Sequence, residues 1–153
     1  MKREGLMLGL LMAAVMTVGA QNVLNDKGDN ILGQYLVEQG SDVSKVRFTK
    51  ASDGSYTCQI YWLRDLYDKD GKVYTDERNP DKSLRNVPAN KIVLIKGLKY
   101  NASKKQWDGT KVYDPQRGLK ANVVVTFTDD GQLKVKGSVL GISETVYWKR
   151  LNE

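Results

Sequence analysis

The chain reads LKANVVVTFTDDGQLKVKGSVLGISETVYWKRL over residues 119–151. Apolar and polar side chains alternate there with a period of two, which is the pattern of strands that have one buried face. Asp129-Asp130-Gly131 and Gly141 interrupt the alternation, and their residue types are typical of tight turns. Because short turns join antiparallel neighbours, this stretch predicts a three-stranded meander.

The same alternation continues toward the N-terminus. Eight strands are predicted in all, at Ile31–Glu38, Val43–Lys50, Ser55–Leu63, Lys91–Tyr100, Lys105–Tyr113, Leu119–Thr128, Gln132–Ser138 and Glu144–Leu151. Sequential strands hide their apolar face in a sandwich or in a closed barrel, and closure removes both unpaired edges. We therefore expect an all-β fold, an eight-stranded antiparallel up-and-down barrel.

Alternation also predicts which side chains face the interior. In the third predicted strand, Tyr56, Cys58, Ile60 and Trp62 share one face, which we expect to be the buried one. Cys58 is the only cysteine of the chain, so it has no partner for an internal disulfide. The sequence predicts a buried, unreactive thiol there.

One connection is much longer than a hairpin loop. Residues 64–90 separate the third and fourth predicted strands and are mostly polar, whereas hairpin loops have about 2–5 residues. Tyr67, Val73, Tyr74, Leu84 and Val87 are spaced through the segment. Their spacing predicts an ordered lid that packs over one end of the barrel.

The N-terminus has the pattern of a secretory signal peptide. Lys2 and Arg3 precede an apolar stretch from Leu6 to Val18, and Ala20 offers a cleavage site. A retained anchor is the competing interpretation, but the stretch is shorter than the roughly 20 residues that cross a bilayer. We expect residues 1–20 to be removed, leaving one domain, 21–153, without a membrane span, in the periplasm or secreted.

Composition excludes several kinds of chemistry. The 153 residues include no histidine, so the commonest general base and zinc ligand are missing. The formal net charge is +6, but the lysines are scattered, so nucleic-acid binding is not predicted. No nucleophile motif is present, and we expect a protein that is not an enzyme and has no cofactor.

A calcium site is not predicted either. Asp68-Lys69-Asp70-Gly71, with Glu77 further on, has part of the spacing of a calcium loop. Leu66 occupies the first position, where a ligating aspartate is required, and no helices flank the segment. A turn with solvated carboxylates explains these residues better, so no metal ligands are assigned.

Several short motifs resemble those of a known family. They are Trp62-Leu63, Asp76-Glu77-Arg78-Asn79-Pro80-Asp81, Leu84-Arg85, Gly97-Leu98, Val112-Tyr113-Asp114-Pro115, Leu133-Lys134-Val135-Lys136-Gly137 and Trp148-Lys149-Arg150. Together they resemble domain of unknown function 2147, a family of small exported bacterial proteins. The resemblance covers the chain after its signal peptide and implies an exported β-barrel without an established activity.

The two ends of the predicted barrel are similar to those of lipocalins. Gly33-Gln34-Tyr35 resembles the Gly-x-Trp of their first strand, and Arg150 resembles the arginine that packs across that ring. The likeness implies a lipocalin-like barrel in which closure brings Tyr35 and Arg150 together. A guanidinium stacked on an aromatic face contributes about 0.5–2 kcal/mol.

Five residues are candidates for ligand binding at the mouth of the barrel: Trp62, Asn79, Arg85, Tyr113 and Asp114. The guanidinium of Arg85 suits a carboxylate or phosphate, because it offers a planar fork of donors. The structural alternative is that Asp81 caps a helical turn, that Arg85 pairs with a neighbouring carboxylate, and that Tyr113-Asp114-Pro115 builds a turn.

Three functional hypotheses remain open. The first is a non-enzymatic exported barrel whose lid and mouth hold a small, partly apolar ligand. A packed interior that leaves no cavity of about 300 Å3 or more would rule it out. The second is a rigid scaffold whose loops bind another envelope or extracellular protein, which an exposed apolar patch on residues 64–90 would favour. The third is a hydrolase with two facing carboxyl groups, one of them with a raised pKa.

Overall fold

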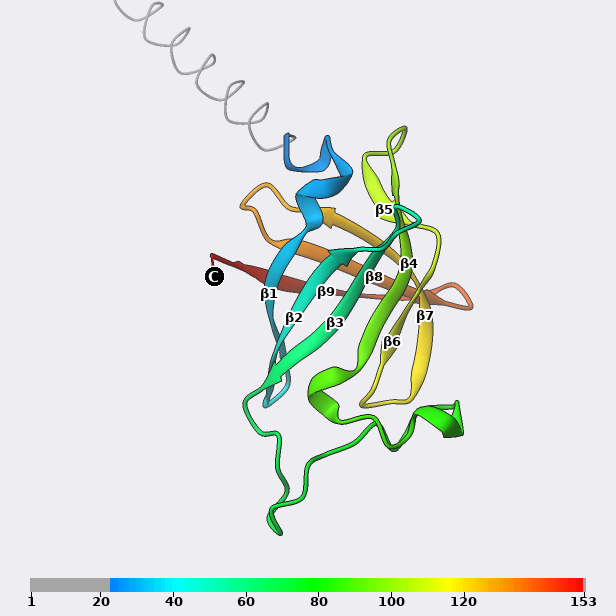
Figure 1. The fold of residues 1–153 in the computed structure, drawn as a ribbon. Helices are drawn as coiled ribbons and strands as arrows, with labels where there is room; N and C mark the ends of the chain where they lie inside the picture. Colours follow the sequence, from blue (N-terminus) through cyan, green and yellow to red (C-terminus); the bar gives the residue numbers. More distant parts are fainter. Residues whose placement is uncertain (1–22, 153) are drawn as a thin grey trace, which may run out of the picture.

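A single closed β-barrel makes up most of the protein (Figure 1). The computed structural model describes residues 23–152, so the predicted signal peptide, residues 1–20, lies outside the described residues. The strands are β1 (Gly33–Gln39), β2 (Asp42–Lys50), β3 (Tyr56–Leu63), β4 (Val93–Asn101), β5 (Gln106–Asp108), β6 (Lys111–Asp114), β7 (Leu119–Phe127), β8 (Leu133–Val139) and β9 (Ile142–Leu151). The predicted all-β class is confirmed.

Closure is made by the first and last strands. β1 pairs with β9 through Gln34, Tyr35 and Leu36, opposite Leu151, Arg150 and Lys149. The guanidinium carbon of Arg150 lies 5.9 Å from the ring centroid of Tyr35, and Arg150 donates a hydrogen bond to the carbonyl of Leu32. The predicted lipocalin-like closure is therefore confirmed.

The fifth predicted strand is divided in two. β5 and β6 both pair with β4 and β7, but Gly109 and Thr110 separate them. Gly109 has a φ of +87°, which glycine adopts readily because it has no Cβ. The Thr110 hydroxyl donates to the carbonyl of Lys96 and so fixes the break. The barrel thus keeps its eight predicted strand positions, with one of them bent.

Buried apolar side chains pack in the interior of the barrel. Its largest fully buried members are Trp107, Tyr35, Phe48, Ile31, Ile95, Leu98, Leu133, Val46, Val125 and Cys58. The predicted burial of Cys58 is confirmed, and burial also raises the pKa of its thiol, which is the direction expected of an unreactive cysteine. Apolar area removed from water stabilises such a core by about 25 cal/mol per Å2.

Trp62 does not share the buried face of its strand, which corrects the sequence interpretation. In the pairing of β3 with β2, Ile60 lies opposite Val46 and Trp62 opposite Lys45, so Tyr61 is an extra residue. A bulge of this kind reverses which face the following side chains occupy. Trp62 is 40% exposed, and the Lys45 ammonium lies 5.2 Å from its ring centroid.

An N-terminal arm, residues 23–32, closes one end of the barrel (Figure 1). It contains two 3₁₀ turns, Val23–Asn25 and Gly28–Ile31. Asn25 exchanges two hydrogen bonds with the backbone of Phe127, and the Trp107 indole N–H donates to the carbonyl of Gly28 at 3.0 Å. The arm is therefore part of the folded barrel.

The long connection between β3 and β4, residues 64–92, lies at the opposite end (Figure 1). Its outer part forms a small hairpin with a bridge between Tyr67 and Val73, whereas Val87 and Ala89 pack against the core. Two 3₁₀ turns, Lys82–Leu84 and Ala89–Lys91, lie on its return path. We call these residues the β3–β4 connection.

A leucine in the β8–β9 turn offers a stability prediction. Leu140 has a φ of +50° and is 98% exposed, and Gly141 follows with a φ of +80°. Positive φ strains leucine, whereas asparagine followed by glycine is the preferred pair for such a turn. We expect Leu140→Asn to raise the free energy of unfolding by about 1 kcal/mol, or the melting temperature by about 3–6 °C. Leu140→Val, measured in parallel, should lower both, because branching at Cβ worsens the strain.

Candidate functional site

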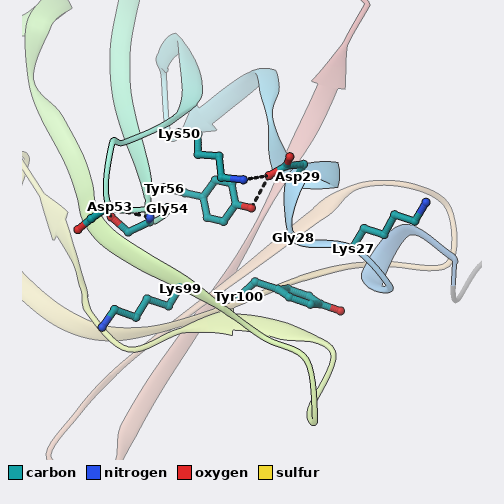
Figure 2. Close-up of a pocket in the computed structure, with 10 residues that line it drawn as sticks. Lys27, Gly28, Asp29, Lys50, Asp53, Gly54, Tyr56, Lys99 and Tyr100 are labelled. Atoms are coloured by element: carbon teal, nitrogen blue, oxygen red, sulfur yellow. Dashed lines mark hydrogen bonds and ion pairs between the residues drawn. The ribbon is translucent and has the colours of Figure 1, made fainter.

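A pocket of about 510 Å3 lies between the N-terminal arm and the rim of the barrel (Figure 2). Its lining comes from the arm, from the β2–β3 hairpin and from the end of β4. The residues are Lys27, Gly28, Asp29, Lys50, Asp53, Gly54, Ser55, Tyr56, Lys99 and Tyr100. We call this hollow the arm pocket.

Asp29 is the centre of the polar contacts in the arm pocket. Its Oδ1 accepts a hydrogen bond of 2.6 Å from the Tyr56 hydroxyl and one of 2.9 Å from the Lys50 ammonium, as Figure 2 shows. These hydrogen bonds, first from Tyr56 and then from Lys50, lower the pKa of Asp29. In turn, burial and the Asp29 carboxylate raise the pKa of Tyr56, so the pair is an ionised carboxylate held by a neutral phenol.

The other lining residues leave room for a ligand. Lys27 and Lys99 extend on two sides of the pocket in Figure 2, with their ammonium groups turned away from Asp29. Asp53 is engaged locally, because its carboxylate accepts hydrogen bonds from the backbone N–H and the hydroxyl of Ser55. The Tyr100 hydroxyl donates to the carbonyl of Asn25 and holds that ring at the rim.

Asp29 predicts a difference in acid stability. A carboxyl group whose pKa is lowered on folding stabilises the protein above its unfolded pKa, here 3.8, and loses that effect as the pH falls through its folded pKa. We expect Asp29→Asn to be less stable than wild type at pH 7 and the difference to shrink below pH 3.8. Thermal unfolding from pH 7 down to about pH 2 measures it. Asp70→Asn, on an exposed turn, is the control for removing a carboxylate and should be as stable as wild type at pH 7.

Three of the five residues predicted for ligand binding lie together at the other end of the barrel. Asn79 and Arg85 belong to the β3–β4 connection, and Tyr113 belongs to β6. Asp76, which the sequence interpretation did not single out, joins them. Its Oδ1 accepts a hydrogen bond of 2.7 Å from the Tyr113 hydroxyl, and its Oδ2 accepts one of 2.8 Å from the Asn79 amide.

Three side-chain hydrogen bonds join the members of this group, and the Asn79 amide oxygen also accepts one from the backbone N–H of Asp81. Asp76, Asn79 and Tyr113 are all buried, and the Nε of Arg85 donates to the carbonyl of Asn79 at 2.8 Å. Burial raises the pKa of Tyr113, with a further contribution from its hydrogen bond to Asp76. We call Asp76, Asn79, Arg85 and Tyr113 the anchor cluster, because it fastens the β3–β4 connection to the barrel.

Asp114 and Trp62 lie apart from the anchor cluster. Asp114 accepts a hydrogen bond from the backbone N–H of Gln116 and lies 3.5 Å from Arg117, as expected of a turn residue. Trp62 lies on the outside of β3. None of the five predicted residues lines the arm pocket, and their role in ligand binding stays a prediction.

The arm pocket was not found from the sequence because its residues come from three distant segments. The signal present was local: Gly28-Asp29-Asn30 has turn composition, and Asp53-Gly54 is a hairpin turn. Gly28 shows why that residue type is needed, since a Cβ there would lie 2.7 Å from the Tyr56 hydroxyl and 3.0 Å from Tyr100. Nothing in either turn indicates that the two meet.

A second pocket of about 610 Å3 opens where β5 gives way to β6. It is lined by Asp108, Gly109, Thr110, Lys111, Asn122 and Val123.

Residues 23–152 contain no group of three or more histidine, cysteine, aspartate or glutamate side chains arranged to hold a metal ion. In that same range no helix is long and apolar enough to cross a membrane.

The pKa shifts of the described carboxyl groups bear on the hydrolase hypothesis. Those whose pKa departs from the ordinary value are all shifted down, by hydrogen bonds or ion pairs: Asp29, Asp53, Asp81, Asp130 and Glu144. A general acid at neutral pH requires a raised pKa. None of these five carboxyl groups has that shift.

Comparison with known proteins supports the fold and the family resemblance. Residues 33–150 match the family described as uncharacterized protein conserved in bacteria, DUF2147. The structure is similar to protein HP1028 from the human pathogen Helicobacter pylori, described as belonging to the lipocalin family. That match has a TM-score of 0.62 and 27% identity, and covers 80% of this chain and 84% of the other. No curated protein matches the chain.

Proposed function

Because this chain belongs to the bacterial family DUF2147 and folds as a lipocalin-like barrel, we propose that it is a non-catalytic binding protein whose small ligand occupies the arm pocket. The observation that carries the proposal is the position of this hollow, between the arm and the rim of a barrel whose interior holds the buried core. Its volume of about 510 Å3 falls in the range of small-ligand sites.

The lining indicates the chemistry of the ligand. Lys27, Lys50 and Lys99 give the pocket three cationic groups against the two carboxylates of Asp29 and Asp53. Asp29 already pairs with Lys50, and the charge of Lys99 helps to lower the pKa of Asp53. The long side chains of Lys27 and Lys99 are able to fold onto an anionic group. The rings of Tyr56 and Tyr100 add apolar surface. A small anion with a flat or apolar part fits this set.

The proposal includes export to the periplasm or the medium. The signal-peptide pattern of residues 1–20 supports it, and so does a chain whose single cysteine is buried and unreactive. The test is the N-terminal sequence of the protein recovered from its own host. A mature chain that begins at Gln21 supports export, and an intact Met1 contradicts it.

Native mass spectrometry of the protein purified from its own host tests the ligand. We expect an added mass of a few hundred daltons on the wild type and its loss from the double variant Lys27→Glu/Lys99→Glu. Lys82→Glu, on the exposed 3₁₀ turn of the β3–β4 connection, is the matched control and should keep the added mass. Absence of any small molecule, or equal retention in all three proteins, would contradict the proposal.

A protein partner is the second candidate, favoured by one observation. The β3–β4 connection exposes Tyr67, Val73, Tyr74 and Leu84 at the end of the barrel opposite the arm pocket. Exposed apolar side chains gathered on one segment are typical of interaction sites. A pull-down from envelope extract should then yield a partner that the variant Tyr67→Ser/Tyr74→Ser does not retain, whereas a partner held equally by both proteins contradicts this candidate.

A further inference from the structure

The last strand of the barrel has a free edge. β9 pairs with β8 from Ile142 to Trp148. On its other side, β9 pairs with β1 only at Lys149, Arg150 and Leu151. Within residues 23–152, no strand pairs with the other side of 142–148. Figure 1 shows β1 and β9 diverging from their contact, so that the β8–β9 hairpin extends past β1.

The hairpin turn determines which backbone groups point to this free edge. Leu140 and Gly141 form a two-residue turn with positive φ at both positions, and Val139 and Ile142 close it as partners. In such a hairpin the closing pair is hydrogen-bonded and the bonded pairs then alternate along the ladder. The backbone N–H and C=O groups of Ser143, Thr145 and Tyr147 therefore point away from β8, toward the free edge.

The side chains of the segment suit the addition of another strand. All six residues from Ile142 to Tyr147 are exposed, and they are rich in β-branched and aromatic types without proline. Ile142 and Val146 lie on the same face as the buried Trp148, and Ile142 is 78% exposed. A strand docked at this edge would cover both apolar side chains with its own inward-facing residues.

The charged side chains of β8 and β9 indicate which side chains an added strand would carry on its outer face. Lys134, Lys136 and Lys149 lie on the outer face of β8 and β9, where they alternate with the core-facing Leu133, Val135 and Trp148. The only carboxylate of residues 133–151 is Glu144, which lies on the inner face and is engaged by Arg117. A strand added beside β9 lies about 10 Å from β8, within reach of lysine and glutamate side chains together.

We propose that the free edge of β9, residues 142–148, binds an extended peptide segment of a partner protein in which apolar residues alternate with acidic ones. The backbone groups of Ser143, Thr145 and Tyr147 bind the main chain of the peptide. Ile142 and Val146 contact its apolar side chains, and the lysines of the hairpin pair with its acidic side chains. A second copy of this chain fits less well, because edge-to-edge pairing of β9 would bring two lysine-bearing faces together. This surface is separate from the arm pocket, so the two proposals stand or fall independently.

The test uses two synthetic probes, the blocked octapeptides (Val-Glu)4 and (Val-Lys)4, with the full-length mature protein at low salt. Isothermal titration calorimetry should show saturable binding of (Val-Glu)4 that is at least about tenfold tighter than that of (Val-Lys)4. Amide hydrogen exchange should slow at Thr145 and Tyr147 when (Val-Glu)4 is added, and not at Val146.

Two pairs of variants separate the backbone from the charge contribution. Thr145→Pro removes an edge donor without removing a bond to β8 and should weaken binding at least about tenfold, whereas Thr145→Val should retain it. Lys134→Glu/Lys136→Glu should reverse the preference between the two probes. Circular dichroism checks that each variant is folded. If Thr145→Pro does not fold, the slowing of amide exchange in the wild type on addition of (Val-Glu)4 tests the backbone contribution instead.

Three results would overturn the proposal. One is no saturable binding of (Val-Glu)4, and another is equal binding by Thr145→Pro and Thr145→Val. The third is a concentration-dependent dimer in analytical ultracentrifugation that Thr145→Pro abolishes, because a second copy would then occupy the edge.

Discussion

Trp107→Ala is expected to lower the free energy of unfolding by about 3–5 kcal/mol, the cost of removing a fully buried tryptophan from a packed core. Trp107 is 0% exposed, and its ring lies 5.2 Å from that of Tyr100 and 5.7 Å from that of Phe127, between centroids. Its indole N–H also holds the N-terminal arm through the carbonyl of Gly28. The variant should therefore loosen the arm and the arm pocket together, which urea unfolding and amide exchange of residues 23–32 measure.

Two further tryptophan variants serve as controls. Trp107→Phe keeps most of the ring packing and loses the hydrogen bond to Gly28, so it should cost about 1–2 kcal/mol. Trp62→Ala removes a side chain that the bulge at Tyr61 has turned to the surface, so it should cost less than about 1 kcal/mol. Equal losses for Trp107→Ala and Trp62→Ala would contradict the buried position of Trp107 and the exposed position of Trp62.

Asp76→Ala is expected to lower the free energy of unfolding by about 2–4 kcal/mol, because it leaves two buried donors without an acceptor. These are the hydroxyl of Tyr113 and the amide of Asn79, which donate to the two oxygens of the carboxylate. Since the cluster fastens the β3–β4 connection, proteolysis within residues 64–90 should become faster in the variant. Urea unfolding gives the first quantity and limited trypsin digestion the second.

A double-mutant cycle separates the anchor cluster from a general loss of stability. Tyr113→Phe alone should lower the free energy of unfolding by about 1 kcal/mol. In the Asp76→Ala background the same substitution should lower it by much less, because the Tyr113 hydroxyl then has no acceptor left to lose. Additive losses would mean that the two side chains do not act together. Asp70→Asn, at the exposed tip of the same connection, controls for charge and should change neither stability nor proteolysis.

The anchor cluster shows how far sequence reasoning reached at this end of the barrel. It brought together Asn79, Arg85 and Tyr113, and the structure places these three near one another. It did not include Asp76, whose importance comes from being buried between Asn79 and Tyr113. Burial of a carboxylate in a polar loop depends on a contact 37 residues away, and no local pattern reports such a contact.

The sequence by itself determined the strands and their antiparallel order, because alternation with a period of two and short turns are local properties of the chain. It favoured the closed barrel over a sandwich because closure leaves no unpaired edges. Through the likeness to lipocalins it also indicated that Tyr35 and Arg150 meet, since closure of a meander joins its first and last strands. Only the tertiary structure decided the outward turn of Trp62, the arm pocket and the free edge of β9. Each of these depends on the register in which distant strands and turns meet, and register is set by the packing of the whole barrel.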